Sequence, residues 1–311
     1  MTNKKAQILS EVIKYSLVLI VAVLIVVIGY KAVNLVKEKI CNTEIAKFEI
    51  EMKGIDKSLR FGARQSQSYD APCNAEQIYF FGFGKSTSPE NFKAIPIIKD
   101  ALESRSGNNV FIIKNGDVKR SFYAGQLEID YPYYKCFSPK FGKISFFAEG
   151  AGNSAKIIGS CDQPDCTLIP IGISDAETRK VMQDLIGACS NCPSALDSDM
   201  DNKIQLTRQS VDMFRSFDSC DGTTNIKIII RPKSNAAINN FNFYEIIPKD
   251  CVDDLNKQLV GNINDALEIK SDPIVVWHFD EIKSEKIISY KLNMELSNEC
   301  KEVIEGMGII G

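Results

Sequence analysis

The chain begins with a nearly unbroken run of apolar residues, from residue 17 to residue 30. Counted with the mostly apolar residues 12–15 and 32–36, it reaches the ~20 residues that a membrane-spanning helix needs. Lys4 and Lys5 precede the run, and basic residues favour the cytoplasmic side of a membrane. The pattern therefore predicts a single-pass protein of the cell membrane, anchored in the lipid bilayer with the bulk of the chain extracellular.

Apolar residues continue beyond this run at helical spacing. They recur three to five residues apart and so form one stripe on a charged helix. The stripe predicts a helix from Gln7 to Arg60, with Gly62 as its stop, whose second half packs against a globular head. Its members are Val36, Ile40, Ile45, Phe48, Met52, Ile55 and Leu59.

A β-rich pattern begins near Tyr69. Residues 76–84, 108–129 and 142–161 are rich in β-branched and aromatic residues, with turn signals at Asn115-Gly116 and Gly150–Asn153. Two helices interrupt them, one within residues 89–107 and one over residues 174–188, which Asp175 can cap. These elements predict a first α+β head over residues 62–196.

The remaining residues, 197–311, contain short apolar runs separated by Pro, Gly and Asn. This pattern predicts an antiparallel β-sandwich of immunoglobulin-like type, with one helical insert over residues 250–267. The whole chain is then of the α+β class, with a transmembrane and stalk helix over residues 7–61 ahead of two heads. The runs read as strands are residues 202–207, 225–232, 240–249, 272–282 and 286–296.

Composition limits the chemistry. A net charge of -3 gives no case for nucleic-acid binding, and a single His weakens the case for His-based catalysis. Ten Cys residues, an even number, are consistent with disulfide bonds and an oxidising compartment. The disulfide candidates are Cys41, Cys73, Cys136, Cys161, Cys166, Cys189, Cys192, Cys220, Cys251 and Cys300.

The stretch "KKAQILSE", Lys4 to Glu11, resembles the class III signal peptide of archaeal type IV pilins and related surface proteins. The resemblance implies a leader of residues 1–6, removed by a prepilin peptidase that cuts between Ala6 and Gln7. It also implies that Glu11, fifth in the mature chain, neutralises the α-amine of a neighbouring subunit during assembly into a homo-oligomeric filament. Lys14 departs from the family pattern and could pair with Glu11 instead, as in an ordinary anchor.

Less specific stretches, "APCNAEQIYF", "FYEIIPK" and residues 272–292, resemble uncharacterised archaeal surface proteins. They imply an extracellular fold but no activity.

The cysteine spacing leaves alternatives open. Cys161-x4-Cys166 and Cys189-x2-Cys192 could form a four-thiolate zinc site or a redox pair, but an extracellular location favours disulfides. Cys136 and Cys161 flank the hairpin at Gly150–Asn153, and we expect them to be bridged.

An acidic stretch follows the first head. Asp197, Asp199 and Asp201 occupy positions 1, 3 and 5 of a calcium-loop pattern, where three carboxylates can converge on one cation. Two residues depart from the pattern: Asn202 replaces the turn glycine, and Arg208 replaces the bidentate glutamate. Calcium is therefore a candidate cofactor, and a solvated acidic linker is the alternative.

The sequence contains no recognisable set of catalytic residues, such as a nucleophile with its base. The stretch Gly82–Ser86 lacks the first glycine of a phosphate loop, and His278 stands alone in a predicted strand. The sequence therefore predicts a pilin-like extracellular protein without enzymatic activity, working as a filament subunit for surface display or adhesion. The alternative is a monomeric, single-pass anchored module that binds a ligand or acts as a receptor.

Overall fold

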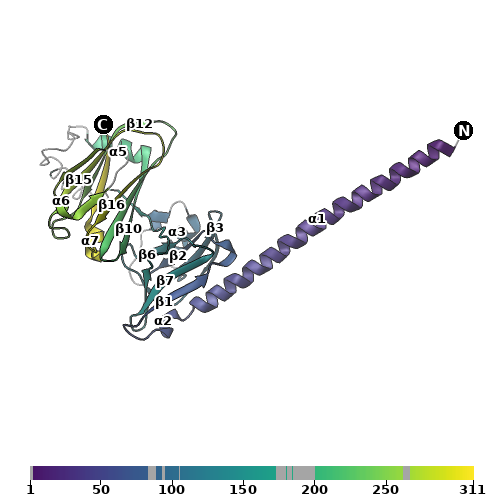
Figure 1. Ribbon diagram of the computed structural model, residues 1–311, viewed down its shortest axis with the longest axis horizontal. Helices are drawn as coiled ribbons and strands as arrows, with labels where there is room; N and C mark the ends of the chain where they lie inside the picture. Colours follow the sequence, from purple (N-terminus) through teal and green to yellow (C-terminus); the bar gives the residue numbers. More distant parts are fainter. Residues whose placement is uncertain are drawn as a thin grey trace.

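A computed structural model of the chain describes residues 3–82, 89–92, 95–104, 106–172, 180, 184, 200–261 and 267–311. One helix, α1 (Asn3–Met52), projects as a long rod from two β-rich heads (Figure 1). All but one of the strand pairings are antiparallel; the exception is the short pair β5–β8 (Leu127–Glu128 and Ala155–Gly159). The predicted α+β class, with a long amino-terminal helix ahead of β-rich heads, is confirmed.

The first helix ends eight residues earlier than the stripe predicts. Gly54 has a φ of 88°, a left-handed conformation that stops α1 at Met52, and the short helix α2 (Ile55–Ser58) follows. The predicted stripe is buried in the first head from Ile45 onward. Val36 and Ile40, however, are exposed, so the contact with the head begins only near Cys41.

The first head contains two four-stranded sheets. Their facing sides and the buried end of α1 enclose one apolar core. In spatial order, one sheet is β1 (Arg64–Asp70), β7 (Lys143–Gly150), β8 and β5. The other is β4 (Asp117–Phe122), β3 (Val110–Lys114), β2 (Gln77–Phe81) and β6 (Tyr134–Phe137).

Strand β2 shows why its sequence is continuously apolar rather than alternating. Ile78 and Phe80 point into the core between the sheets, whereas Tyr79 and Phe81 point to the opposite face. That face is covered by the 3-10 helix η2 (Pro89–Phe92), helix α3 (Pro96–Glu103) and their buried side chains. A strand buried on both faces has no polar side to present.

The second head is a β-sandwich, as predicted. Apolar side chains from both of its sheets form one core, which contains the single tryptophan, Trp277. One sheet has the order β13 (Leu259–Gly261), β16 (Lys286–Leu292), β11 (Thr223–Pro232), β10 (Val211–Cys220) and β9 (Ile169–Pro170). The other has the order β14 (Leu267–Ser271), β15 (Ile274–Ile282), β12 (Ile238–Ile246) and β17 (Glu305–Ile310), with the short helix α7 (Asn298–Val303) before β17.

Two elements of this head differ from the sequence prediction. Residues 202–207, read as a strand, lie in helix α5 (Met200–Ser210), where Ile204 and Thr207 share a buried face at a spacing of three. The helical insert is only the four-residue α6 (Leu255–Gln258), and the chain continues directly into strand β13. Of the helix predicted over residues 174–188, only the helical residues 180 and 184 are among those described.

The heads are joined more closely than a boundary between residues 196 and 197 implies. Strand β9 pairs with β10 and so adds residues 169–170 to the sheet of the second head. A disulfide between Cys161 and Cys220 links the loop after β8 to the end of β10. The segment that follows β8 therefore belongs to the junction of the two heads.

Candidate functional site

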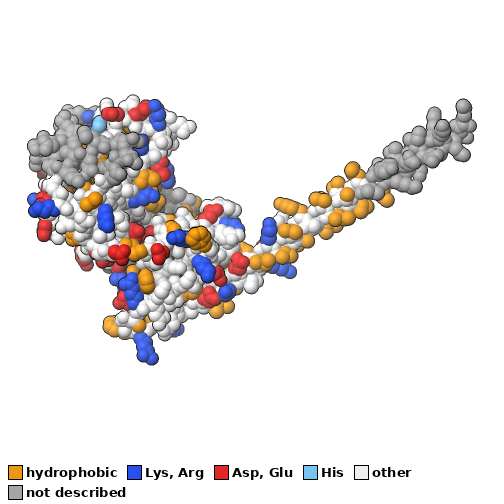
Figure 2. All heavy atoms as spheres, viewed as in Figure 1, with side chains coloured by type: hydrophobic (Ala, Val, Ile, Leu, Met, Phe, Trp, Pro, Cys, Tyr) orange, Lys and Arg blue, Asp and Glu red, His pale blue; other side chains and the backbone are white. Residues whose placement is uncertain are grey.

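The exposed part of α1 is the first functional surface. The helix carries an apolar segment long enough to cross a membrane, and no part of that segment is buried inside the protein. Hydrophobic side chains line the described length of the rod in Figure 2. An apolar surface of this size is unfavourable in water and is more stable in a bilayer or against other apolar surfaces.

The residues of the predicted processing and assembly site lie within α1. Ala6, Gln7 and Glu11 are helical in backbone, and their side chains lie outside the described part of the structure. On a helix, Glu11 and Lys14 are three residues apart and so share one face. The processing and pairing roles of these residues stay predictions.

Eight cysteines form four disulfides, which supports an oxidising environment for the heads. The bridges are Cys41–Cys73, Cys136–Cys166, Cys161–Cys220 and Cys251–Cys300. Cys189 and Cys192 lie outside the described residues.

The predicted bridge between Cys136 and Cys161 is wrong. Strand β6 places Cys136 beside Cys166, whose backbone N–H donates to the Cys136 carbonyl at 3.0 Å, whereas Cys161 faces the second head. Because Cys161 and Cys166 are in different disulfides, the four-thiolate zinc arrangement is also wrong.

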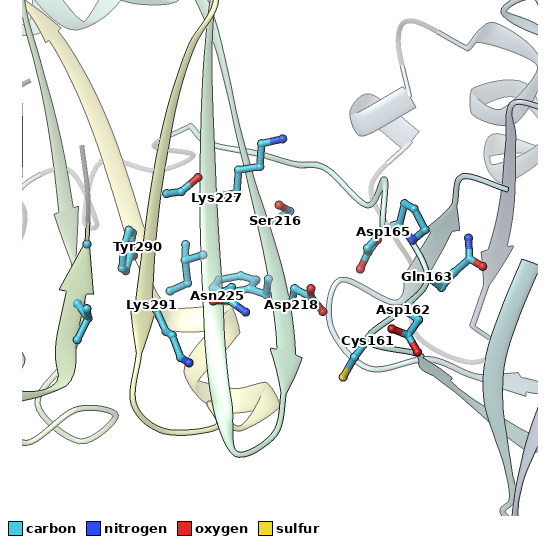
Figure 3. A pocket seen from close by; sticks show the side chains of 16 residues that line it. Cys161, Asp162, Gln163, Asp165, Ser216, Asp218, Asn225, Lys227, Tyr290 and Lys291 are labelled. Carbon is cyan, nitrogen blue, oxygen red and sulfur yellow. The ribbon is translucent and has the colours of Figure 1, made fainter. Parts of the chain in front are cut away.

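A groove of about 660 Å³ opens at the junction of the two heads (Figure 3). One wall is the loop of residues 161–165 from the first head. The facing wall is the outer surface of β10, β11 and β16 in the second head, with the tip of β13 beside them. The Cys161–Cys220 disulfide spans the junction and ties the two walls together at one point.

Strand register arranges the sheet wall in two polar rows. In each row the three side chains sit on neighbouring strands, on the outer face of the sheet, which lines the groove (Figure 3). Lysine, hydroxyl and amide groups at this spacing suit hydrogen bonding to a polar ligand. The rows are Ser216, Lys227 and Ser289, and then Asp218, Asn225 and Lys291.

Asp162 and Asp165 lie on the loop wall of the groove, and Asp218 lies on the sheet wall. Asp165 forms an ion pair with Lys135 and accepts a hydrogen bond from the Thr167 backbone N–H at 2.8 Å. Although Asp218 reaches solvent, desolvation between the heads raises its pKa; Asp165 adds to this effect and Lys135 opposes it. The groove thus presents negative charge near the junction and amino groups further along the sheet.

Most of the stretch that resembles a calcium loop, residues 200–208, is helical. Asp197 and Asp199 lie outside the described residues, and Asp201 is the second residue of α5. Because two of the three carboxylates are not among the described residues, calcium binding at Asp197, Asp199 and Asp201 stays a prediction. Among the residues that the structure describes, no group of three or more His, Cys, Asp or Glu could hold a metal ion.

His278 lies in β15, as the sequence predicts. Its Nδ1 is 2.7 Å from Asn242 Oδ1 and its Nε2 is 3.2 Å from Asp280 Oδ1. These contacts with its own and the neighbouring strand are consistent with a structural role. Of the stretch Gly82–Ser86, only Gly82 is among the described residues.

Comparison with known proteins gives little further guidance. No family model matches the chain, and no curated protein matches it. Among solved structures, a chitin-binding domain of a chitinase from Pyrococcus furiosus is similar over 28% of this chain and 82% of its own. The sequence identity is 6% and the TM-score is 0.21, values too low to establish a shared fold or a shared ligand.

Proposed function

We propose that this chain is a membrane-anchored, pilin-like surface protein whose extracellular heads are displayed by a filament assembled through α1. The main support for the proposal is the length of α1 that is exposed and packs against neither head. Among the residues of α1 whose side chains the structure describes, only those from about Cys41 onward contact a head.

A plain membrane anchor leaves part of this helix unexplained. Residues 17–40 span about 36 Å at ~1.5 Å per residue, more than a hydrocarbon core of ~30 Å. Beyond the ~20 residues that fill the core from residue 17 onward, Ile40 is still exposed on the way to the head. Packing of α1 against the same segment of neighbouring subunits buries the apolar helix along its whole length, Ile40 included, and so removes apolar surface from water.

The resemblance of residues 4–11 to a class III signal supports the same proposal. Cleavage before Gln7 creates an α-amine, and Glu11 then lies about 6 Å further along the helix, from four residues at ~1.5 Å each. An axially shifted neighbour brings its amine level with this carboxylate. The pair neutralises two charges that are costly in hydrocarbon.

Two measurements on native cells test this function. Amino-terminal sequencing of the purified protein should find Gln7 as the first residue, and electron microscopy should show surface filaments. Glu11→Ala and Glu11→Gln should make filaments scarce while leaving cleavage and the distant heads intact. Glu38→Gln, a matched change at an exposed site further along α1, should have no such effect. A mature chain that starts at Met1 or Thr2 contradicts the pilin-like proposal.

The second candidate is a monomeric anchored module that binds a polar ligand. The observation in its favour is the groove between the heads, with its two rows of hydrogen-bonding side chains. In that case α1 acts only as an anchor, Glu11 pairs with Lys14 at the interface, and Glu11→Ala leaves the cell surface unchanged.

A further inference from the structure

An exposed aromatic residue stands out on the first head. Phe141, in the turn between β6 and β7, is 94% exposed and has a φ of 53°. Lys140 and Lys143 exchange both backbone hydrogen bonds, at 2.8 and 3.1 Å, so Phe141 and Gly142 form a two-residue hairpin turn. The first place in such a turn favours Asn, Asp or Gly, because a bulky side chain is strained in the left-handed region.

The packing of the head does not account for this phenylalanine. Its ring is almost fully in solvent, whereas its backbone is in a conformation that glycine adopts without strain. A strained, solvent-exposed aromatic side chain is consistent with a contact made outside the chain.

The turn lies where α1 meets the first head. The Ala71 backbone N–H donates to the Gly142 carbonyl at 2.8 Å. The residue before Ala71, Asp70, has its Oδ1 3.9 Å from Lys143 Nζ and its Oδ2 3.7 Å from Lys47 Nζ of α1. Two residues after Ala71, Cys73 forms a disulfide with Cys41 of α1.

Strand β1 therefore runs back along α1 toward the apolar part of the helix. The turn at Phe141 sits at that end of β7, beside the start of the head contact. Phe61, a second highly exposed phenylalanine among the described residues of this head, bridges to Gly150 at the opposite end of β7.

The length of the anchor places this end of the head at the bilayer surface. If residues 17–36 fill the hydrocarbon core, Cys41 lies only about 8 Å beyond it, from five residues at ~1.5 Å each. That distance is close to the outer edge of the headgroup layer, which is ~5–8 Å thick on each side of the bilayer. Aromatic rings are favoured in this layer. The lysines on either side of Phe141 suit anionic headgroups, although Asp70 offsets part of the charge of Lys143.

We propose that the turn of residues 140–143 is a second membrane contact, in which Phe141 inserts into the headgroup layer of an anionic bilayer. This contact holds the first head against the membrane while the chain is anchored there. The inference rests on the proposed anchoring by α1.

Depth-dependent quenching tests the contact on the full chain. The protein is reconstituted into vesicles of phosphatidylcholine and phosphatidylglycerol that contain brominated acyl chains, as the variants Phe141→Trp and Phe61→Trp. Phe61 is 85% exposed, so it is a matched control at the far end of the head. The native Trp277 is buried in the second head and gives the same background in both variants.

We expect at least twofold stronger quenching for Phe141→Trp than for Phe61→Trp, and weaker quenching without the anionic lipid. Equal quenching of the two variants overturns the contact, while co-flotation with the vesicles still supports the anchor. A chain that does not float with the vesicles overturns both proposals.

A stability measurement separates this role from packing. In detergent, Phe141→Gly should melt at the parent temperature or above it, because glycine relieves the left-handed strain. A melting temperature several degrees lower would show that Phe141 supports the fold and would overturn the proposal.

Discussion

Arg215 on β10 and Glu245 on β12 form an ion pair inside the second head, with 2.7 Å between Arg215 Nε and Glu245 Oε1. Their side chains are 6% and 0% exposed, and the pair joins the two sheets of the sandwich. Arg215 also donates to the Ile304 carbonyl at 2.8 Å, and the Tyr290 hydroxyl donates to Glu245 Oε2 at 2.6 Å. Burial and the neighbouring Glu245 carboxylate raise the pKa of Tyr290, which keeps its proton for this bond.

Replacing one member of this ion pair should lower the free energy of unfolding far more than replacing both members. Arg215→Met leaves the Glu245 carboxylate buried and unpaired, and should lower the free energy of unfolding by about 3–5 kcal/mol. The double variant Arg215→Met with Glu245→Met should recover much of that loss. Urea unfolding followed by Trp277 fluorescence measures both, because Trp277 lies 5.4 Å from the Tyr290 ring in the same core.

Arg231→Met provides the matched control for this experiment. Arg231 pairs with Glu285 at 2.9 Å on the surface, where such a pair contributes about 1 kcal/mol or less. A single Arg215 variant as stable as the double variant would show that Glu245 is not held as a buried ion.

The disulfide between the heads can be checked directly. Peptide mapping without reductant should recover the four linked pairs of the structure, including Cys161 with Cys220. Replacing both of these cysteines by alanine should cost about 2–4 kcal/mol of stability, because the bridge closes a loop between distant parts of the chain. Calorimetry of the variant measures the loss, and a peptide linking Cys136 to Cys161 would contradict the structure.

Gly150 sits where only glycine fits. A Cβ atom at this position would lie 2.2 Å from the Arg60 carbonyl oxygen, in the segment that connects α2 to β1. Gly150→Ala should therefore destabilise the first head by about 1–3 kcal/mol, through displacement of the backbone. The exposed Gly172 has open space around its Cβ position, so Gly172→Ala should change the melting temperature little.

Asp218 should make stability depend on pH. Its pKa in the folded protein is raised, mainly by desolvation, so ionisation is less favourable there than in the unfolded chain. Its unfavourable contribution is absent below the unfolded pKa of ~3.9 and grows as pH rises through the folded pKa.

Asp218→Asn should accordingly raise the melting temperature at pH 7 and have little effect at pH 3. Asp221→Asn, in the adjacent turn, is the control, since Asn tolerates the φ of 54° at that position. Equal shifts at both pH values would argue against a titration effect at Asp218.

Features that depend on neighbouring residues could be predicted from the sequence. The apolar run and the stripe from Ile45 to Met52 identified α1, because helical periodicity is written into a single segment. Alternation and turn residues located the hairpin of β7 and β8 and the sandwich strands β11, β12, β15 and β16. The even number of cysteines indicated disulfides, and eight of them are paired.

The tertiary structure decided what depends on distant partners. Strand β10 has apolar residues at Val211, Met213 and Phe217, but Arg215 interrupts that alternation. The facing Glu245, together with the Ile304 carbonyl, stabilises the buried arginine. Residues 202–207 are helical because Ile204 and Thr207 pack beneath β17, where the Thr207 hydroxyl accepts a hydrogen bond from the Ile310 N–H. Cysteine pairing and the groove between the heads depend in the same way on contacts between segments far apart in the chain, which no local pattern encodes.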